Sequence, residues 1–269
     1  MLRITLTSAV LLACAVPAAA QTTYASTRDT LRFHETRQAH MTLTMPQGEI
    51  PIEMEQRATI SVVRLPGDSA RAWFDSLAIS AKSPQGEQSP PTDSALKRTF
   101  RFGFDARGRV KNVSSPAWPA ALQGVTDLSH QFDDFFLRLP AKPLTVGAAW
   151  SDTTTLTDST TEKYSRWVRK ANYRVERDTI VGAVPALVIS VKQTLGVILS
   201  QPVPGQQMRT DAQLSGEESG FFVFAPKTGR LIGRRQEGKL EGPVKASGAM
   251  GEMQMNQSLS YTGALDSLK

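Results

Sequence analysis

Alternation of apolar and polar residues constrains this chain more than any other feature. In Glu49–Val62 the even-numbered positions are mostly apolar and the odd-numbered positions mostly polar. A period of two places one face of a β-strand on a core and the other face in water. The same rhythm returns in Leu187–Leu199 and in three later segments, with short turns between them. Consecutive strands joined by short turns predict an antiparallel meander.

The number of predicted strands favours a curved sheet. We count five strands before residue 115 and about six after residue 149, with Ser69–Ser80 interpreted as a strand rather than a helix. Because open sheets of ~10 or more strands normally curl, we expect a mainly β fold. The expected architecture is a large curved antiparallel sheet, an open half-barrel of about eleven strands, with a short helical insert on its concave face. The predicted single domain spans 21–269, with an N-terminal half (21–114), the insert (115–149) and a C-terminal half (150–269).

The insert contains a stretch with helical spacing. Val125, Leu128, Phe132, Phe135 and Leu139 fall on one face, and the following proline predicts the end of the helix. The aromatic residues of the insert have two interpretations, a plug that closes the sheet or the wall of a hydrophobic pocket. An amphipathic helix over a curved sheet must bury its apolar stripe, which favours the plug. If a ligand is held there, the candidate lining residues are Trp118, Phe132, Phe135, Phe136 and Trp150.

A second, weaker pattern links the two halves. An aromatic strand, a glycine turn and an Arg followed by an aliphatic residue occur at Phe100–Val110 and again at Phe222–Leu231. One such echo suggests two similarly built halves without establishing a repeat.

The first twenty residues are typical of an export signal. Arg3 supplies the positive charge, Ile4–Val16 is a short apolar run, and 17–20 reads Pro-Ala-Ala-Ala. This pattern predicts a secretory signal peptide cleaved after Ala20. The alternative is a lipoprotein in which Cys14, the single cysteine, is lipidated. No later apolar run reaches the ~18 residues of a membrane helix. We therefore expect a periplasmic or secreted protein whose mature chain has no transmembrane segment.

Charge and histidine placement predict neither a nucleic-acid partner nor a metal. The 31 Lys and Arg against 25 Asp and Glu give a net charge of +6, but the basic residues are scattered among apolar and acidic ones. That distribution fits a solvated sheet face better than a nucleic-acid footprint. His34 and His40 lie on one predicted strand, ~20 Å apart, and His130 stands alone beside Asp133. We expect no metal and no cofactor.

One pair of short motifs points to an enzyme. Ser94–Lys97 matches S-x-x-K and Lys227–Gly229 matches K-T-G, two elements of penicillin-recognising serine enzymes. In those enzymes the serine must begin a buried helix, whereas Ser94 follows a Pro-Pro loop and leads directly into a strand. Short patterns of this kind arise often by coincidence. We therefore expect no catalytic residues.

The phrase Leu139–Trp150, LPAKPLTVGAAW, resembles a group of exported bacterial β-rich proteins of unknown function. These carry L-P-x-K-P-x-x-x-G-x-x-W between two strand-rich halves. The group is similar in shape to the LolA/LolB-like lipoprotein carriers, which are curved sheets lidded by helices. The resemblance implies a space for hydrophobic cargo between sheet and insert, but no carrier motif is matched and no residue role carries over.

These observations predict an exported soluble non-catalytic protein that binds a lipid or other apolar ligand between the sheet and the insert. The alternative is an envelope interaction or scaffold protein with a packed core and no small ligand.

Overall fold

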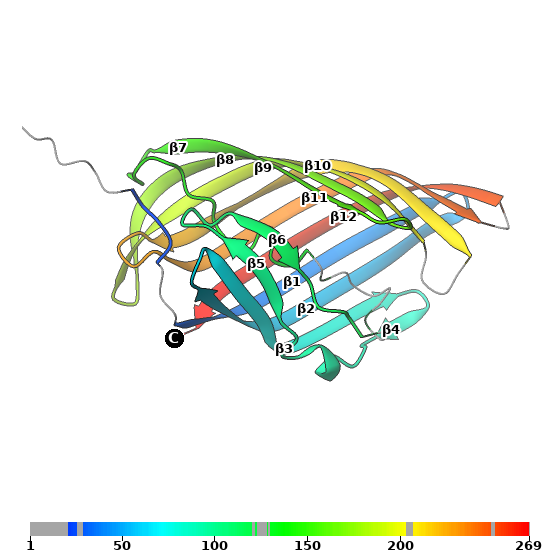
Figure 1. Cartoon of the computed structure of the whole chain (residues 1–269). Coiled ribbons are helices and arrows are strands. Elements are labelled where there is room, and N and C mark those ends of the chain that lie inside the picture. Colours follow the sequence, from blue (N-terminus) through cyan, green and yellow to red (C-terminus); the bar gives the residue numbers. More distant parts are fainter. Residues whose placement is uncertain are drawn as a thin grey trace, which may run out of the picture.

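The predicted curved antiparallel sheet is present. The computed structural model describes residues 21–25, 29–119, 122, 128, 130–202, 207–248 and 251–268. Within these ranges twelve strands form one sheet, six on each side of the insert (Figure 1). Their bounds are β1 Thr30–Met45, β2 Gly48–Leu65, β3 Ser69–Ser83, β4 Gly86–Gln88, β5 Phe100–Phe104, β6 Val110–Ser114, β7 Ala149–Ser159, β8 Tyr164–Val181, β9 Val184–Pro202, β10 Met208–Ala225, β11 Arg230–Gly248 and β12 Gly251–Leu268. The ambiguous segment from Ser69 is a strand, as predicted.

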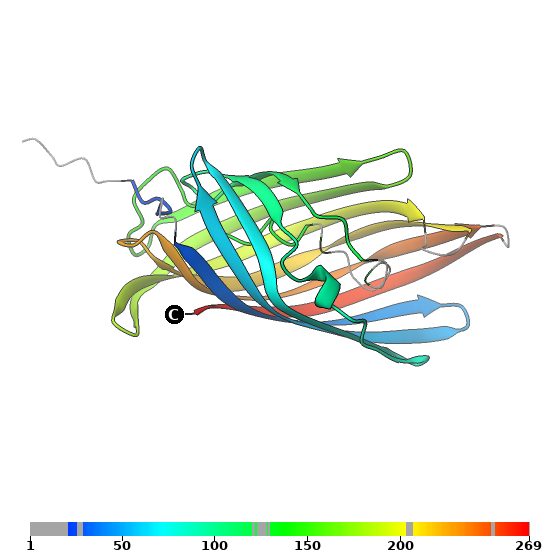
Figure 2. The same ribbon diagram turned by 60° about the horizontal axis from the view of Figure 1, so that its bottom comes forward.

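The first and last strands, β1 and β12, pair with each other in the middle of the sheet. The strand order is β6-β5-β3-β2-β1-β12-β11-β10-β9-β8-β7, with the short β4 paired to β3. From β1, the N-terminal strands therefore follow one another outward until β6 forms one edge of the sheet. The chain then crosses to β7, which forms the opposite edge. Segment 115–148 makes this crossing, and it runs through the mouth of the curved sheet (Figure 2). The two edges are thus connected by the insert and not by strand pairing in the described residues.

The strands are long and their faces are well separated. Seven of them contain 16 to 19 residues, so each spans roughly 50–60 Å at about 3.3 Å per residue. The register places Glu35 opposite Ala58 on β2 and Leu265 on β12, and Arg234 opposite Leu265. These residues face the concave side. Their immediate neighbours in sequence face outward, as the period of two requires.

The core lies where the insert meets the sheet. Phe132 contacts Phe100 and Phe102 of β5, with ring centroids 4.7 and 5.4 Å apart. Phe136 lies 4.4 Å from Phe104 in the same way, and Phe135 of the insert lies 5.3 Å from Phe33 of β1. These rings are buried. Aromatic side chains bury large apolar areas, so this cluster is the main attachment of the insert to the sheet.

The predicted helix of the insert is absent from its described part. Residues 130–136 form consecutive turns and bends, with bonds such as Asp133 N–H to His130 O and Phe135 N–H to Phe132 O. Leu128 and residues 137–139 have no regular secondary structure, and Val125 lies outside the described residues. An amphipathic helix needs one face in water, whereas Gln131, Asp133 and Arg138 are buried as well as the phenylalanines. A segment covered on all sides satisfies its backbone through turns and side chains instead.

The N-terminal residues 21–25 join the two echoed turns. Tyr24 N–H donates to Ala106 O in the β5–β6 turn, and Ala25 N–H donates to Gly229 O in the β10–β11 turn. The Tyr24 ring lies edge-on to Phe104 and to Phe224, 5.1 Å from each. The sequence echo therefore corresponds to two turns on opposite sides of one tyrosine. A Cβ on Gly229 would come within 2.3 Å of Ala25 N, so glycine is required there.

Candidate functional site

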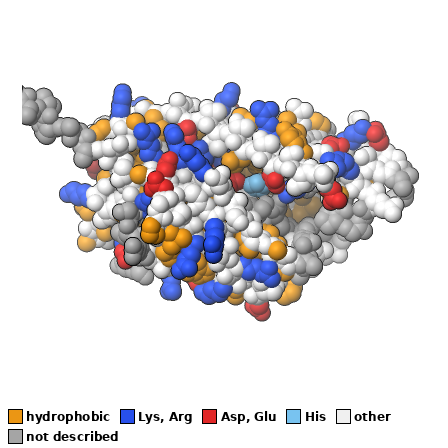
Figure 3. Space-filling model, in the orientation of Figure 1, with side chains coloured by type: hydrophobic (Ala, Val, Ile, Leu, Met, Phe, Trp, Pro, Cys, Tyr) orange, Lys and Arg blue, Asp and Glu red, His pale blue; other side chains and the backbone are white. Residues whose placement is uncertain are grey.

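A cavity of about 440 Å³ lies between the insert and the concave face of the sheet. The insert contributes Leu128, His130, Gln131, Asp133 and Asp134, and the sheet contributes side chains from eight strands. Figure 3 shows the molecule in the orientation of Figure 1, with basic and acidic side chains intermingled over this face. The lining of the cavity divides into a charged part beside the insert and an apolar part further along the strands.

The charged part is built around Glu35, which is completely buried on β1. Its carboxylate accepts hydrogen bonds from Gln131 Nε2 at 2.6 Å and Arg37 Nη2 at 2.8 Å. Arg234 of β11 donates to Glu35 Oε1 at 3.3 Å and to Asp134 O at 2.7 Å. Burial lowers the pKa of Arg234, and the neighbouring Glu35 carboxylate opposes that effect. Buried charges are tolerated only when paired and hydrogen-bonded, and this network meets both conditions.

A second carboxylate, Glu218 of β10, lies deeper on the same face. It accepts hydrogen bonds from Gln193 Nε2 at 2.6 Å, Gln236 Nε2 at 2.7 Å and the Tyr261 hydroxyl at 2.5 Å. Burial raises the pKa of Glu218, and the Tyr261 hydrogen bond opposes the rise. The three donors hold the carboxyl in a fixed position whether or not it carries a proton.

The apolar part of the cavity consists of Trp167, Leu195, Leu199, Leu240 and Leu259. These side chains belong to, or pack against, a second hydrophobic cluster that is separate from the aromatic core. Leu199 also lines a further hollow of about 710 Å³ whose lining includes Met45 and Met255. The apolar part of the cavity therefore adjoins this second hollow at Leu199.

The five aromatic residues predicted to line a ligand site lie elsewhere. Phe132, Phe135 and Phe136 are enclosed in the aromatic core, and Trp118 packs beside Phe74 and Phe100. Trp150 stacks on Tyr173 at 5.1 Å and donates from Nε1 to Arg138 O at 3.0 Å. None of the five is among the residues that line the cavity.

The polar network at the cavity was missed in the sequence, although a signal was present. Glu218 and Arg234 line the cavity, and Gln193 and Glu35 are their buried partners. All four occupy positions where the alternation calls for apolar residues. Polar residues in the buried phase of a strand need partners, and such residues on several strands are a sign of a shared internal network.

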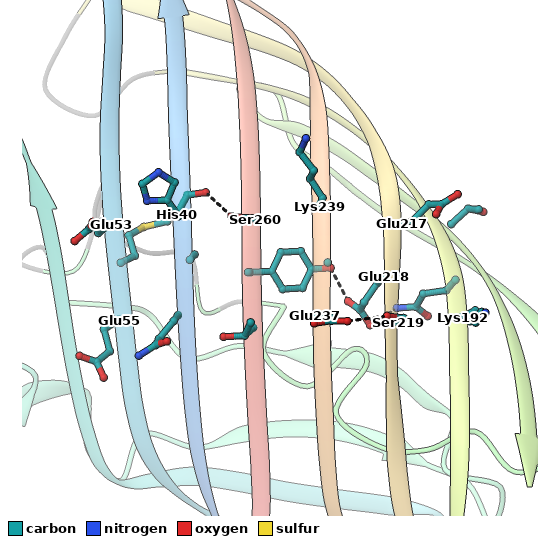
Figure 4. Close-up of a pocket in the computed structure, with 18 of the residues that line it drawn as sticks. His40, Glu53, Glu55, Lys192, Glu217, Glu218, Ser219, Glu237, Lys239 and Ser260 are labelled. Atoms are coloured by element: carbon teal, nitrogen blue, oxygen red, sulfur yellow. Dashed lines mark hydrogen bonds between the residues drawn. The ribbon is translucent and has the colours of Figure 1, made fainter. Parts of the chain in front are cut away.

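A larger hollow of about 1300 Å³ is lined mainly by the outward-facing side chains (Figure 4). In register, Glu53, His40, Ser260, Lys239 and Glu217 form one row across five strands. Such rows of mixed sign stabilise a sheet by cross-strand pairing and are typical of a solvated face. The cavity of the concave face is more enclosed and chemically divided, so it is the better candidate for a ligand site.

Of the remaining sequence motifs, only His130 and Asp133 line the cavity. Ser94 is exposed in a short 3₁₀ helix, Asp93–Ala95, and the Lys97 ammonium contacts Asp75. His34 and His40 are exposed on β1, and His130 Nδ1 lies 2.7 Å from Asp133 Oδ2. In the part of the chain that the structure describes, no group of three or more His, Cys, Asp or Glu side chains is placed to hold a metal ion. Among the same residues, no helix has the length and apolar character to cross a membrane.

Comparison with known proteins gives structural neighbours only. No protein-family model and no curated protein matches the chain. A solved structure of lipovitellin, described for its lipid–protein interactions, aligns with 89% of this chain at 12% identity and a TM-score of 0.48. The chain spans a quarter of the lipovitellin chain. Neisserial surface protein A aligns with 87% of this chain and 96% of its own length, at 8% identity and a TM-score of 0.25. Similarity at this level transfers no function.

Proposed function

We propose that the chain is a non-catalytic binding protein that holds a single-chain amphiphile in the cavity of the concave face. One observation supports this most directly, namely the division of one enclosed lining into a hydrogen-bonding part and an apolar part. An amphiphile has the same division. Its polar head would lie beside the insert near Gln131 and Arg234, and its tail would lie along Leu195, Leu199 and Leu259.

The dimensions agree with this assignment. Ligand pockets typically measure ~300–1,000 Å³ and are mostly apolar with a few placed polar groups. Burying a tail gains about 0.8 kcal/mol per methylene. Because association costs at least about 4 kcal/mol, a tail of roughly ten carbons is needed before binding becomes appreciable. The adjoining hollow beyond Leu199, which Met45 and Met255 also line, offers additional space for a tail.

The charged network suits a binding role more than a chemical one. Glu35, Arg234 and Glu218 are each held by several partners within the protein. Side chains held by several internal partners keep their geometry, and a head group then binds to a preorganised surface.

The alternative function is an envelope scaffold with a packed core. The aromatic cluster between the insert and the sheet favours this alternative for the part of the molecule that it fills. Phe132, Phe135 and Phe136 leave no room for a ligand among themselves. The two functions make different predictions for the cavity alone, so the test must be placed there.

The test combines native mass spectrometry with a matched pair of variants. Protein purified from its own host should carry a bound lipid mass, and a fluorescent fatty-acid analogue should bind to delipidated protein. Leu199→Trp fills the apolar part of the cavity and should weaken probe binding at least tenfold. Ile180→Trp, the control, adds comparable bulk on β8, where the side chain is exposed and lines neither hollow. A consistently empty protein, or equal binding by both variants, would favour the scaffold function.

We further propose that the protein is exported, on the strength of residues 1–20. The charged, apolar and small-residue regions in that order support cleavage after Ala20. N-terminal sequencing of the protein from its own host should begin at Gln21. Retention of a lipidated Cys14, lost in Cys14→Ser, would instead establish a lipoprotein.

A further inference from the structure

Arg169 of β8 is the cation of the cavity with the most unused hydrogen-bonding capacity. Its Nη1 lies 2.9 Å from Asp134 Oδ2, and in the described part of the chain it makes this ion pair without a well-aligned hydrogen bond. Arg234, by contrast, donates to Glu35, to Asp134 O and to Phe135 O. A guanidinium has five N–H donors, so Arg169 retains several for a ligand.

A second polar atom on the same strand also lacks a partner. Ser165 is 1% exposed, and its Oγ makes no hydrogen bond within the described residues. Ser165 and Arg169 both face inward on β8 and both line the cavity, with Trp167 between them. Buried polar atoms without a partner are rare in native proteins and call for an explanation. A bound head group that contacts this face of β8 supplies one.

The charges around Arg169 allow an acid to bind there. Burial lowers the pKa of Arg169, but Asp134 and Glu218 outweigh it and the net shift is upward, so the guanidinium stays positive. The planar guanidinium fork matches the paired oxygens of a carboxylate or phosphate, and such bonds are about twice as strong as neutral ones.

We infer that the ligand is an acidic amphiphile whose oxyanion head group binds Arg169, with its tail lying along Trp167, Leu195 and Leu199. This inference rests on the proposed function and names the ligand class for the same cavity. Carboxylates and phosphate monoesters share the recognised chemistry, and the experiment separates them.

The experiment uses four probes with the same sixteen-carbon tail: hexadecanoate, hexadecyl phosphate, hexadecanol and hexadecyltrimethylammonium. Each displaces the fluorescent probe from delipidated full-length protein. At least one of the two acids should bind about tenfold or more tightly than the alcohol, and the ammonium should bind most weakly. The stronger of the two acids identifies the head group.

Arg169→Gln should reduce the affinity for that acid to the level of the alcohol and leave alcohol binding unchanged. Arg166→Gln is the matched control, because Arg166 lies on the same strand but is exposed on the outward face. If the Arg169→Gln variant fails to fold, Arg169→Lys replaces it, and the ratio between acid and alcohol should fall but stay above one.

The outcomes separate the inference from the proposed function. Equal binding of acids and alcohol by the natural protein, or an unchanged ratio in a folded Arg169 variant, overturns the inference and leaves amphiphile binding intact. Failure of all four probes to bind, whatever their head group, contradicts the proposed function itself.

Discussion

The buried pair between Arg234 and Glu35 allows a quantitative test of the internal network. Both side chains are at most 5% exposed, and Arg234 Nη2 lies 3.3 Å from Glu35 Oε1. Arg234→Met keeps an unbranched chain of similar length and removes the donors. The change therefore removes the polar contacts of the guanidinium, together with its position over the Phe135 ring, and keeps an apolar stem of similar length.

The expected loss follows from the contacts that remain. Removing one partner of a buried ion pair costs about 3–5 kcal/mol. Glu35 keeps its bonds from Arg37 and Gln131, so the lower end applies, about 3 kcal/mol. The lost hydrogen bond to Asp134 O adds about 1 kcal/mol. At roughly 2–4 °C per kcal/mol for a chain of this size, the Tm should fall by about 8–16 °C.

Urea and thermal unfolding measure this loss against two references. Arg235→Met alters the next residue, whose bonds to Asp266 are exposed, and should cost less than about 1 kcal/mol. The double variant Glu35→Leu with Arg234→Met should recover most of the lost stability, because a buried pair replaced by apolar residues is often neutral. Equal losses for Arg234→Met and Arg235→Met would refute the assignment of Arg234 to a buried network.

Three further outcomes follow from other parts of the fold. Phe132→Ala should cost about 3–5 kcal/mol in urea unfolding because the ring is completely buried, and a loss below about 1 kcal/mol would show that the aromatic cluster does not attach the insert. The raised pKa of Glu218 means that the folded state binds more protons than the unfolded state between the ordinary glutamate pKa and the folded one. Stability should therefore fall as the pH rises through that window. Glu218→Gln should gain Tm relative to the natural protein between pH 4 and pH 7. Parallel profiles of Tm against pH for the two proteins would contradict this. Tyr24→Ala should lower the Tm by several degrees, since the side chain contacts Phe104 and Phe224 and donates to Leu137 O at 3.0 Å, and Thr23→Ala, which leaves these aromatic contacts intact, should have a much smaller effect.

Most of the sheet could be predicted from local pattern, while the insert could not. The period of two identified the strands and their inward faces, and turn residues identified their ends. The helical spacing of Leu128, Phe132 and Phe135 predicted a helix, because spacing alone does not reveal whether the intervening polar residues reach water. In the structure Gln131 and Asp133 are buried as partners of other buried side chains, and the segment forms turns.

The candidate site shows the same limit. The aromatic residues drew attention because they are large and clustered in the sequence, yet they form the core. The cavity lining comes from strands far apart in the chain. The buried partners Glu35 and Arg234, for example, are 199 residues apart. Nothing local in either strand indicates which residues of the other it meets.

The sequence by itself determined that the chain is mainly β, that its strands have one buried and one solvated face, and that they form an antiparallel meander. These properties depend on neighbours two residues apart, so they are written in the local pattern. Only the tertiary structure decided that β1 pairs with β12, that the insert connects the two edges, and that Arg169, Glu218 and Arg234 line one cavity. Alternation gives the face of a side chain, whereas strand order, register and curvature decide its neighbours.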